Sequence, residues 1–110
     1  VSGQIGNAIE FDANSEYVDT GSAINLVAAS SWTATVWVRL DADPVGETLM
    51  VLQQLDGSDT TGRTWLGVNT SHQPGTNIGG TGLYANTLNL GQWYHLGVVA
   101  DGSNVTLYLD

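Results

Sequence analysis

Four carboxylates, those of Glu10, Asp12, Glu16 and Asp19, fall within ten residues in the stretch AIEFDANSEYVD. Paired carboxylates supply the general acid and the nucleophile of retaining glycoside cleavage when they lie about 5–5.5 Å apart. Glu16 comes six residues after Glu10, and six residues of extended strand span about 20 Å. A turn at residues 13–15 would shorten this distance, but it would also take Glu16 off the strand. The spacing therefore argues against a catalytic carboxylate pair.

The same stretch has a structural interpretation that needs no chemistry. Its apolar and acidic residues alternate, as in a strand with one face buried. In that interpretation Ile9 and Phe11 point into the core, while Glu10 and Asp12 face water or cap a turn. We therefore expect residues 8–11 to form an opening strand of a protein that is not an enzyme, with glycoside hydrolysis as the less favoured alternative.

The composition excludes several other functions. Eleven Asp and Glu stand against two Arg and no Lys in 110 residues, which gives a net charge of -9. Such a surface repels phosphate backbones and attracts divalent cations, so nucleic acid is not expected as a partner. The absence of cysteine excludes disulfides, thiolate nucleophiles and zinc–thiolate sites. No run of 18 apolar residues is present, so we expect no membrane insertion.

The elements that position the remaining polar and aromatic residues are predicted to be strands. Apolar and polar residues alternate with a period of two, and turn signals rich in Gly, Asp and Asn separate the alternating segments. Many short strands with such turns favour an all-β antiparallel sandwich, or jelly roll, in a single domain covering residues 1–110. One short helical turn is expected within residues 23–29. The predicted strands are residues 8–11, 17–20, 32–40, 49–55, 63–69, 93–100 and 105–110.

Several predicted strands carry a large aromatic residue on the face that the core does not need. If these strands are neighbours, Trp37, Trp65, Trp93 and Tyr108 share one sheet surface. Aromatic rings edged by amide and guanidinium groups bind sugars, because the ring stacks on C–H faces and the polar groups bind hydroxyls. The alternative is that loops cover this face and that the aromatic residues are ordinary packing.

The order of four segments resembles a known family. GQIGNAIEFDANSEYVD, SWTATVWVRLDADP, WLGVN and LNLGQWYHLGVVADGSNVTLYLD follow one another. They resemble the laminin-G-like and pentraxin-like modules of the concanavalin A-type jelly-roll superfamily, from about Gly3 to Asp110. One departure is Ala13, which stands where relatives have the glycine of an F-D-G motif. The resemblance implies the jelly-roll fold and a module of a secreted or cell-surface protein that binds sugars, calcium, other proteins or extracellular matrix.

With this resemblance, the favoured function is an extracellular, non-catalytic carbohydrate-binding or adhesion module. We expect Trp37 and Trp65 to stack on a polysaccharide or glycan, with polar contacts from Arg63 and Asn69. The competing hypothesis is a structural module that binds proteins or spaces domains within a larger secreted protein. His95 follows Trp93 as in the W-x-H of relatives, and we interpret it as packing rather than as a catalytic group.

Calcium is the cofactor that the sequence allows. Asp56 and Asp59 lie in one loop with two hydroxyl residues, and hard oxygen ligands in a loop suit Ca²⁺. Pentraxin-like relatives donate calcium ligands from the loop at this position. The alternative is a solvated acidic turn. Asp41 and Asp43 are a weaker candidate pair, and His72 is expected to be solvated in its loop.

The jelly roll is expected to be an incomplete or minimal version. Relatives have additional strands before the first motif and after the last one. A sheet that lacks neighbours exposes unpaired backbone groups at its edge, and such an edge invites another chain. We therefore expect that another protein chain can complete the sheet edge and that the isolated chain is not a simple monomer.

Overall fold

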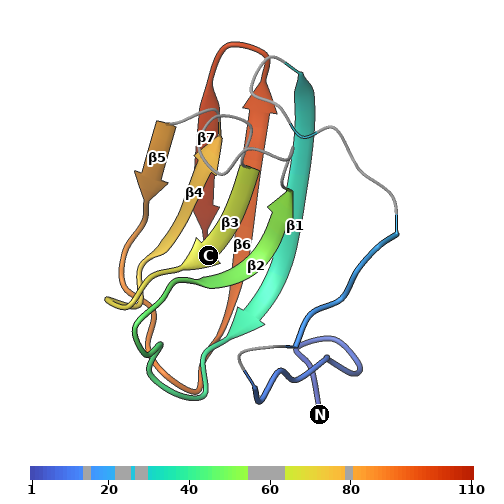
Figure 1. The fold of residues 1–110 in the computed structure, drawn as a ribbon, viewed down its shortest axis with the longest axis vertical. Helices are drawn as coiled ribbons and strands as arrows, with labels where there is room; N and C mark the ends of the chain where they lie inside the picture. The colour runs from blue at the N-terminus through green and yellow to red at the C-terminus, as the bar shows by residue number, and fades with distance from the viewer. Residues whose placement is uncertain (14–15, 22–25, 27–29, 55–63, 79–80) are drawn as a thin grey trace.

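The computed structural model describes residues 1–13, 16–21, 26, 30–54, 64–78 and 81–110, without the side chain of Thr81. These residues contain strands and no helix, and the strands form two antiparallel sheets (Figure 1). This confirms the predicted all-β sandwich. No helix long and apolar enough to cross a membrane occurs among the described residues.

The first sheet has the order β1-β6-β7. β1 (Ser31–Arg39) pairs with β6 (Trp93–Asp101), and β6 pairs with β7 (Val105–Leu109). The three strands agree with the predicted segments within one residue at each end. The β6–β7 turn is closed by Asp101, whose carboxylate accepts hydrogen bonds from the backbone N–H groups of Ser103 and Asn104 at 2.9 and 2.7 Å.

The second sheet has the order β2-β3-β4-β5. β2 (Leu49–Gln54) and β3 (Thr64–Val68) were predicted, whereas β4 (Pro74–Ile78) and β5 (Thr81–Tyr84) were not. Pro74 and the glycines of these strands indicate turns in a sequence. Proline is nevertheless compatible with the first residue of a strand, where Pro74 lies.

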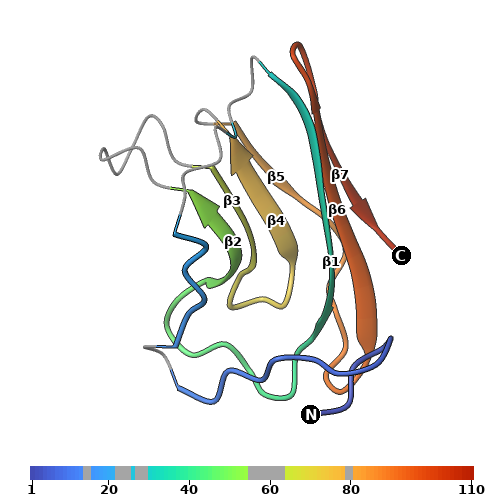
Figure 2. The same cartoon turned by 90° about the vertical axis from the view of Figure 1, so that its right-hand side faces the viewer.

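The core lies between the two sheets, which form two layers in Figure 2. Leu66 and Ile78 of the second sheet pack against Leu96 and Val98 of the first, and each of the four is at most 2% exposed. The inward-facing residues of β1 pack around this cluster, as the alternation along residues 32–40 predicts. They are Trp32, Ala34, Val36 and Val38.

The predicted strands at residues 8–11 and 17–20 are wrong for this structure. Neither segment is assigned as a strand, and Ile9 and Phe11 are 68% and 54% exposed rather than buried. The Glu16 carboxylate accepts hydrogen bonds from the backbone N–H groups of Asp12 and Ala13, at 2.7 and 3.3 Å. It therefore closes a turn, and no described strand lies beside the segment to complete the ladder that a strand needs.

Leu26 connects this N-terminal region to the second sheet. Its backbone N–H donates to Gln54 Oε1 at 2.8 Å, and its carbonyl accepts a hydrogen bond from the Thr64 hydroxyl. Residues 1–13 and 16–21 lie on the side of the sandwich where β1 and β2 are the outermost strands (Figure 2). Apart from Leu26, the helical turn predicted within residues 23–29 lies outside the described residues.

Candidate ligand-binding face

The outward-facing side of sheet β1-β6-β7 carries the largest group of aromatic residues that the fold brings together. Directly paired residues of antiparallel strands share a face, and the pairs on this side include Trp37 with His95 and Arg39 with Trp93. Tyr108 of β7 pairs with Gly97 on the same side. We call the surface formed by Trp37, Arg39, Trp93, His95 and Tyr108 the aromatic face.

Trp37 and His95 form the centre of the aromatic face. Their ring centroids lie 5.0 Å apart and the ring planes are inclined by 28°, so the rings stack. Trp37 remains 38% exposed. His95 is half-buried, which agrees with its interpretation as packing, and it fixes the orientation of the indole ring above the sheet.

The neighbouring cross-strand pair on the aromatic face is Arg39 with Trp93, and it holds the Arg39 guanidinium in a fixed position. The Arg39 guanidinium lies over the Trp93 ring, 5.2 Å from its centroid, and forms two hydrogen bonds with the Asp41 carboxylate, at 2.7 and 2.9 Å. These hydrogen bonds raise the pKa of Arg39, and the negative charges of Asp41 and Glu10 add to the effect. The same hydrogen bonds lower the pKa of Asp41. Arg39 is therefore a charged, oriented donor over Trp93, two residues along β1 from Trp37 and on the same face of the sheet.

Tyr108 and Gly97 extend the face across β6 and β7. Tyr108 is 57% exposed. A methyl group on Gly97 would lie 3.5 Å from a side-chain carbon of Thr35 and 3.6 Å from one of Tyr108, which is ordinary contact.

A broad hollow adjoins one end of the aromatic face. Trp37, Arg39 and Trp93 border it together with residues 1–13 and with the loop between β1 and β2. Glu10 lies close enough to influence the pKa of Arg39, which places the N-terminal segment near the end of β1. A ligand on the aromatic face would therefore be flanked on this side by exposed acidic and apolar residues.

The expectation that Trp65 shares this surface is wrong. β3 pairs with β2 and β4, not with a strand of the first sheet, so Trp65 faces outward on the opposite side of the sandwich. There it lies near Tyr84, with ring centroids 6.5 Å apart and planes inclined by 56°. Trp37 and Trp65 therefore cannot contact the same sugar ring.

The predicted polar contacts are not at the aromatic face in the described structure. The side-chain Oδ1 of Asn69 accepts hydrogen bonds from the backbone N–H groups of Ser71 and Gln73, at 2.9 and 3.0 Å, and so closes the β3–β4 turn. Arg63 lies outside the described residues. The cation that the structure does place over a tryptophan of the aromatic face is Arg39, which the sequence did not single out as a site residue although it lies opposite Trp93 in the strand pairing.

The main calcium candidates, Asp56 and Asp59, lie outside the described residues. Of the weaker pair, Asp41 binds Arg39, and Asp43 lies 2.7 Å from the Nε2 atom of His72. His72 is consequently half-buried rather than solvated as expected, with its side chain 22% exposed. No cluster of three or more His, Asp or Glu side chains suited to a metal occurs in the described part of the chain.

Residues 12–110 match a family of laminin-G-like domains described as the concanavalin A-like lectin/glucanases superfamily. The chain belongs to this superfamily. The match excludes most of the GQIGNAIEFD segment, which is also the part that forms no strand in the structure. No curated protein and no solved structure is similar enough to the chain to be matched with it. Family membership indicates a carbohydrate-binding or adhesion type of module and leaves its ligand open.

Proposed function

We propose that the chain is an extracellular, non-catalytic module that binds a neutral polysaccharide or glycan on the aromatic face. The observation that carries the proposal is the partly exposed Trp37 ring, which stacks on His95 and shares its face of the sheet with Trp93 and the Arg39 guanidinium above it. An indole ring fixed in this way offers a flat apolar surface to the C–H face of a sugar. Arg39 lies on the same face of the sheet as a donor for a hydroxyl group.

The charge of the chain favours a neutral ligand. Side chains that could attract an anion are few, because the chain has two Arg and no Lys against eleven Asp and Glu. Arg39 is already paired with Asp41. The negative charge of the chain would repel a polyanionic polysaccharide at long range, whereas a neutral polysaccharide would meet no electrostatic repulsion.

The proposal of a binding rather than a catalytic module rests on the geometry of the carboxylates. Glu16 uses its carboxylate to close a turn of its own backbone. Glu10 and Asp12 lie on the exposed N-terminal segment. Two carboxylates facing one bound sugar are what glycoside cleavage requires, and the Glu16 turn does not provide this arrangement.

Affinity gel electrophoresis with mixed-linkage β-glucan, xylan and galactomannan, compared with the acidic polysaccharide alginate, tests the proposal. We expect retardation by at least one neutral polysaccharide and none by alginate. Trp37→Ala should weaken binding about thirtyfold or more, as for the loss of ~2 kcal/mol at a central contact. Trp65→Ala, on the opposite side of the sandwich, is the matched control and should bind as the wild type does.

Two results would contradict this function. If Trp65→Ala abolishes binding and Trp37→Ala does not, the ligand site lies on the second sheet. If no neutral glycan is retained while the protein melts cooperatively, the aromatic face is not a sugar site, and the competing hypothesis of a protein-binding module takes its place.

A further inference from the structure

The broad hollow beside the aromatic face is too large for a small-molecule site. Its volume is about 2160 Å³, whereas clefts that bind small molecules measure about 300–1,000 Å³. Residues of the N-terminal stretches 1–13 and 16–21 line it together with the end of β1, the following loop and β2, and Figure 2 shows these parts next to one another. An α-helix with its side chains is about 10–12 Å wide, so this volume corresponds to about four turns of helix.

The walls of the hollow expose aliphatic side chains to water. Ile5, Ile9 and Val45 border the hollow and are 79%, 68% and 86% exposed. Further exposed apolar residues of the same walls are Phe11, Leu49 and Met50. Apolar side chains gathered in this way and rimmed by polar ones are typical of a protein–protein interaction site. Aliphatic side chains offer no flat ring on which a sugar can stack, so glycan binding at the aromatic face does not account for them.

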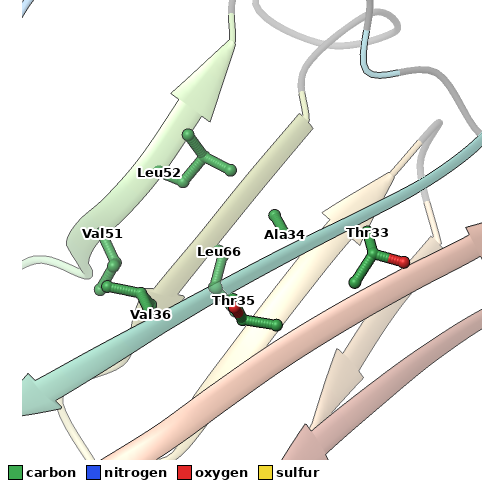
Figure 3. A pocket seen from close by; sticks show the side chains of 7 residues that line it. All are labelled: Thr33, Ala34, Thr35, Val36, Val51, Leu52 and Leu66. Atoms are coloured by element: carbon green, nitrogen blue, oxygen red, sulfur yellow. The ribbon is translucent and has the colours of Figure 1, made fainter.

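The hollow continues into the sandwich between β1 and β2. Val36, Val51 and Leu52 border both the hollow and a smaller apolar groove, and Figure 3 shows the side chains that line this groove. The groove reaches Leu66, a core residue that is 1% exposed. A bulky apolar side chain of a bound segment can enter the groove, and buried anchors of this kind supply most of the affinity of an interface.

Negative charge is concentrated at the same hollow. Of the eleven Asp and Glu of the chain, Asp56 and Asp59 lie outside the described residues, and seven of the remaining nine border the hollow. Two of the seven have cationic partners, since Asp41 is paired with Arg39 and Asp43 with His72. The other five are Glu10, Asp12, Glu16, Asp19 and Glu47. Besides Arg39, the amino group of Val1 is the one positive charge among the described residues that line the hollow.

The arrangement of these carboxylates favours a cationic macromolecule as the partner. In the described part of the chain they form no group of three or more that could hold a metal ion. The net charge of -9 repels a second copy of the chain, nucleic acid and anionic membrane surfaces. Separate Lys or Arg side chains at the border of an apolar stripe are complementary to separate carboxylates around apolar walls.

We propose that the hollow binds a basic amphipathic helix of a partner protein. The apolar side chains of the helix fill the hollow and one of them enters the groove, while its Lys and Arg side chains lie against the five carboxylates. A helix fits better than an extended segment, because it satisfies its own backbone hydrogen bonds. It therefore requires from this chain only the side chains of the hollow and no open strand edge. The proposal does not depend on glycan binding at the aromatic face.

Calorimetric titration of the full chain with three synthetic peptides of about 15 residues, or four helical turns, is the first test. The first peptide places Leu and Lys on opposite faces of a helix, the second has Glu in place of Lys, and the third has Gln in place of Leu. We expect saturable binding of the Leu/Lys peptide that weakens as salt is added, and binding of the other two at least about tenfold weaker. Absence of Leu/Lys binding, or equal binding of either other peptide, would overturn the proposal.

A double variant, Ile9→Ser with Phe11→Ser, tests the apolar walls. It should raise the dissociation constant of the Leu/Lys peptide at least about tenfold, the effect of removing one buried apolar side chain. Because both residues are exposed in the free chain, the variant should melt as the wild type does. Tyr108→Ser is the control, since Tyr108 is as exposed as Phe11, at 57% and 54%, and lies outside the hollow. Unchanged affinity of the double variant would overturn the proposal.

Charge variants separate the hollow from the overall charge of the chain. Glu10→Gln with Glu47→Gln removes two carboxylates of the hollow and should raise the dissociation constant of the Leu/Lys peptide about three- to tenfold. Asp101→Asn with Asp110→Asn removes the same charge outside the hollow and should have a smaller effect. Equal effects of the two double variants would mean that net charge alone attracts the peptide, and would overturn the proposed site.

A fluorescent label locates the bound peptide without removing any contact that the proposal names as essential. The natural chain has no cysteine, so Met50→Cys can carry an environment-sensitive dye at the wall of the hollow, and Asn104→Cys can carry it at the β6–β7 turn. The Leu/Lys peptide should shift the emission of the dye at position 50 to shorter wavelength and leave that at position 104 unchanged. A bound peptide that leaves the dye at position 50 unchanged would lie elsewhere on the surface and would overturn the proposal.

Discussion

Trp37 of β1 and His95 of β6 are direct partners across the sheet, and their rings stack 5.0 Å apart on the outer face. The histidine is half-buried and the tryptophan 38% exposed. His95 therefore supports the Trp37 ring from below, and Trp37 exposes its ring to the solvent. This relationship makes the role of His95 testable apart from that of Trp37.

His95→Ala should weaken glycan binding about two- to tenfold without direct loss of a ligand contact. The physical reason is that a stacked aromatic pair contributes about 0.5–1.5 kcal/mol beyond its buried area, and without it the indole ring is less well oriented. His95→Phe keeps an aromatic ring below Trp37 and should restore most of the affinity. Calorimetric titration with the retained polysaccharide measures both. Equal affinity of His95→Ala and the wild type would show that the stack does not position the ligand surface.

Gly67→Ala should destabilise the protein by about 1–3 kcal/mol, the range for overpacking a close contact. A methyl group at this position would lie 2.5 Å from the backbone oxygen of Leu49, so β2 must shift. Gly97→Ala is the matched control, because its methyl group would meet only ordinary contacts at 3.5 Å and beyond. Urea unfolding monitored by tryptophan fluorescence compares the two. A smaller loss for Gly67→Ala than for Gly97→Ala would contradict the packing described for β2 and β3.

Acid should weaken the β6–β7 turn through Asp101. Hydrogen bonds from the backbone N–H groups of Asn104 and Ser103 lower the pKa of this carboxyl below its ordinary value of 3.8. A lowered pKa in the folded state means that the contribution to stability is fully present above about pH 3.8 and is lost as the pH falls through the lower value.

Thermal melts between pH 6 and pH 2 measure this effect. Asp101→Asn should melt below the wild type at pH 6, and the difference should disappear at the acidic end. Asp12→Asn, on the exposed N-terminal segment, controls for the removal of one negative charge from a chain of net charge -9. A difference that stays constant over the whole pH range would mean that ionisation of Asp101 does not stabilise the turn.

Calcium binding by Asp56 and Asp59 remains a prediction from the sequence. An ion that binds only the folded chain adds about 2.7 kcal/mol at a concentration 100 times its dissociation constant. Melting temperatures in millimolar Ca²⁺ should therefore exceed those in chelator by several degrees. The double variant Asp56→Asn with Asp59→Asn should remove this difference, whereas millimolar Mg²⁺ should not reproduce it. Superimposable melts with and without Ca²⁺ would exclude the site.

The sequence by itself determined which side chains of the long strands face the core. Successive side chains of a strand must point to opposite sides, so the alternation along β3 and β6 puts Leu66, Leu96 and Val98 on the inward face, where all three are buried. The same rule placed Trp37 and Trp65 on outward faces. The period of two is a property of the local backbone and needs no knowledge of the partner strands.

Only the tertiary structure decided which of these outward-facing residues lie on the same surface of the molecule. Whether two outward residues meet depends on strand order, a long-range property that no local pattern contains. This order places Trp37 beside His95 and puts Trp65 on the other side of the sandwich. In the part of the chain that the structure describes, no strand lies beside the alternating residues 8–11, and a strand exists only where another backbone completes its hydrogen bonds.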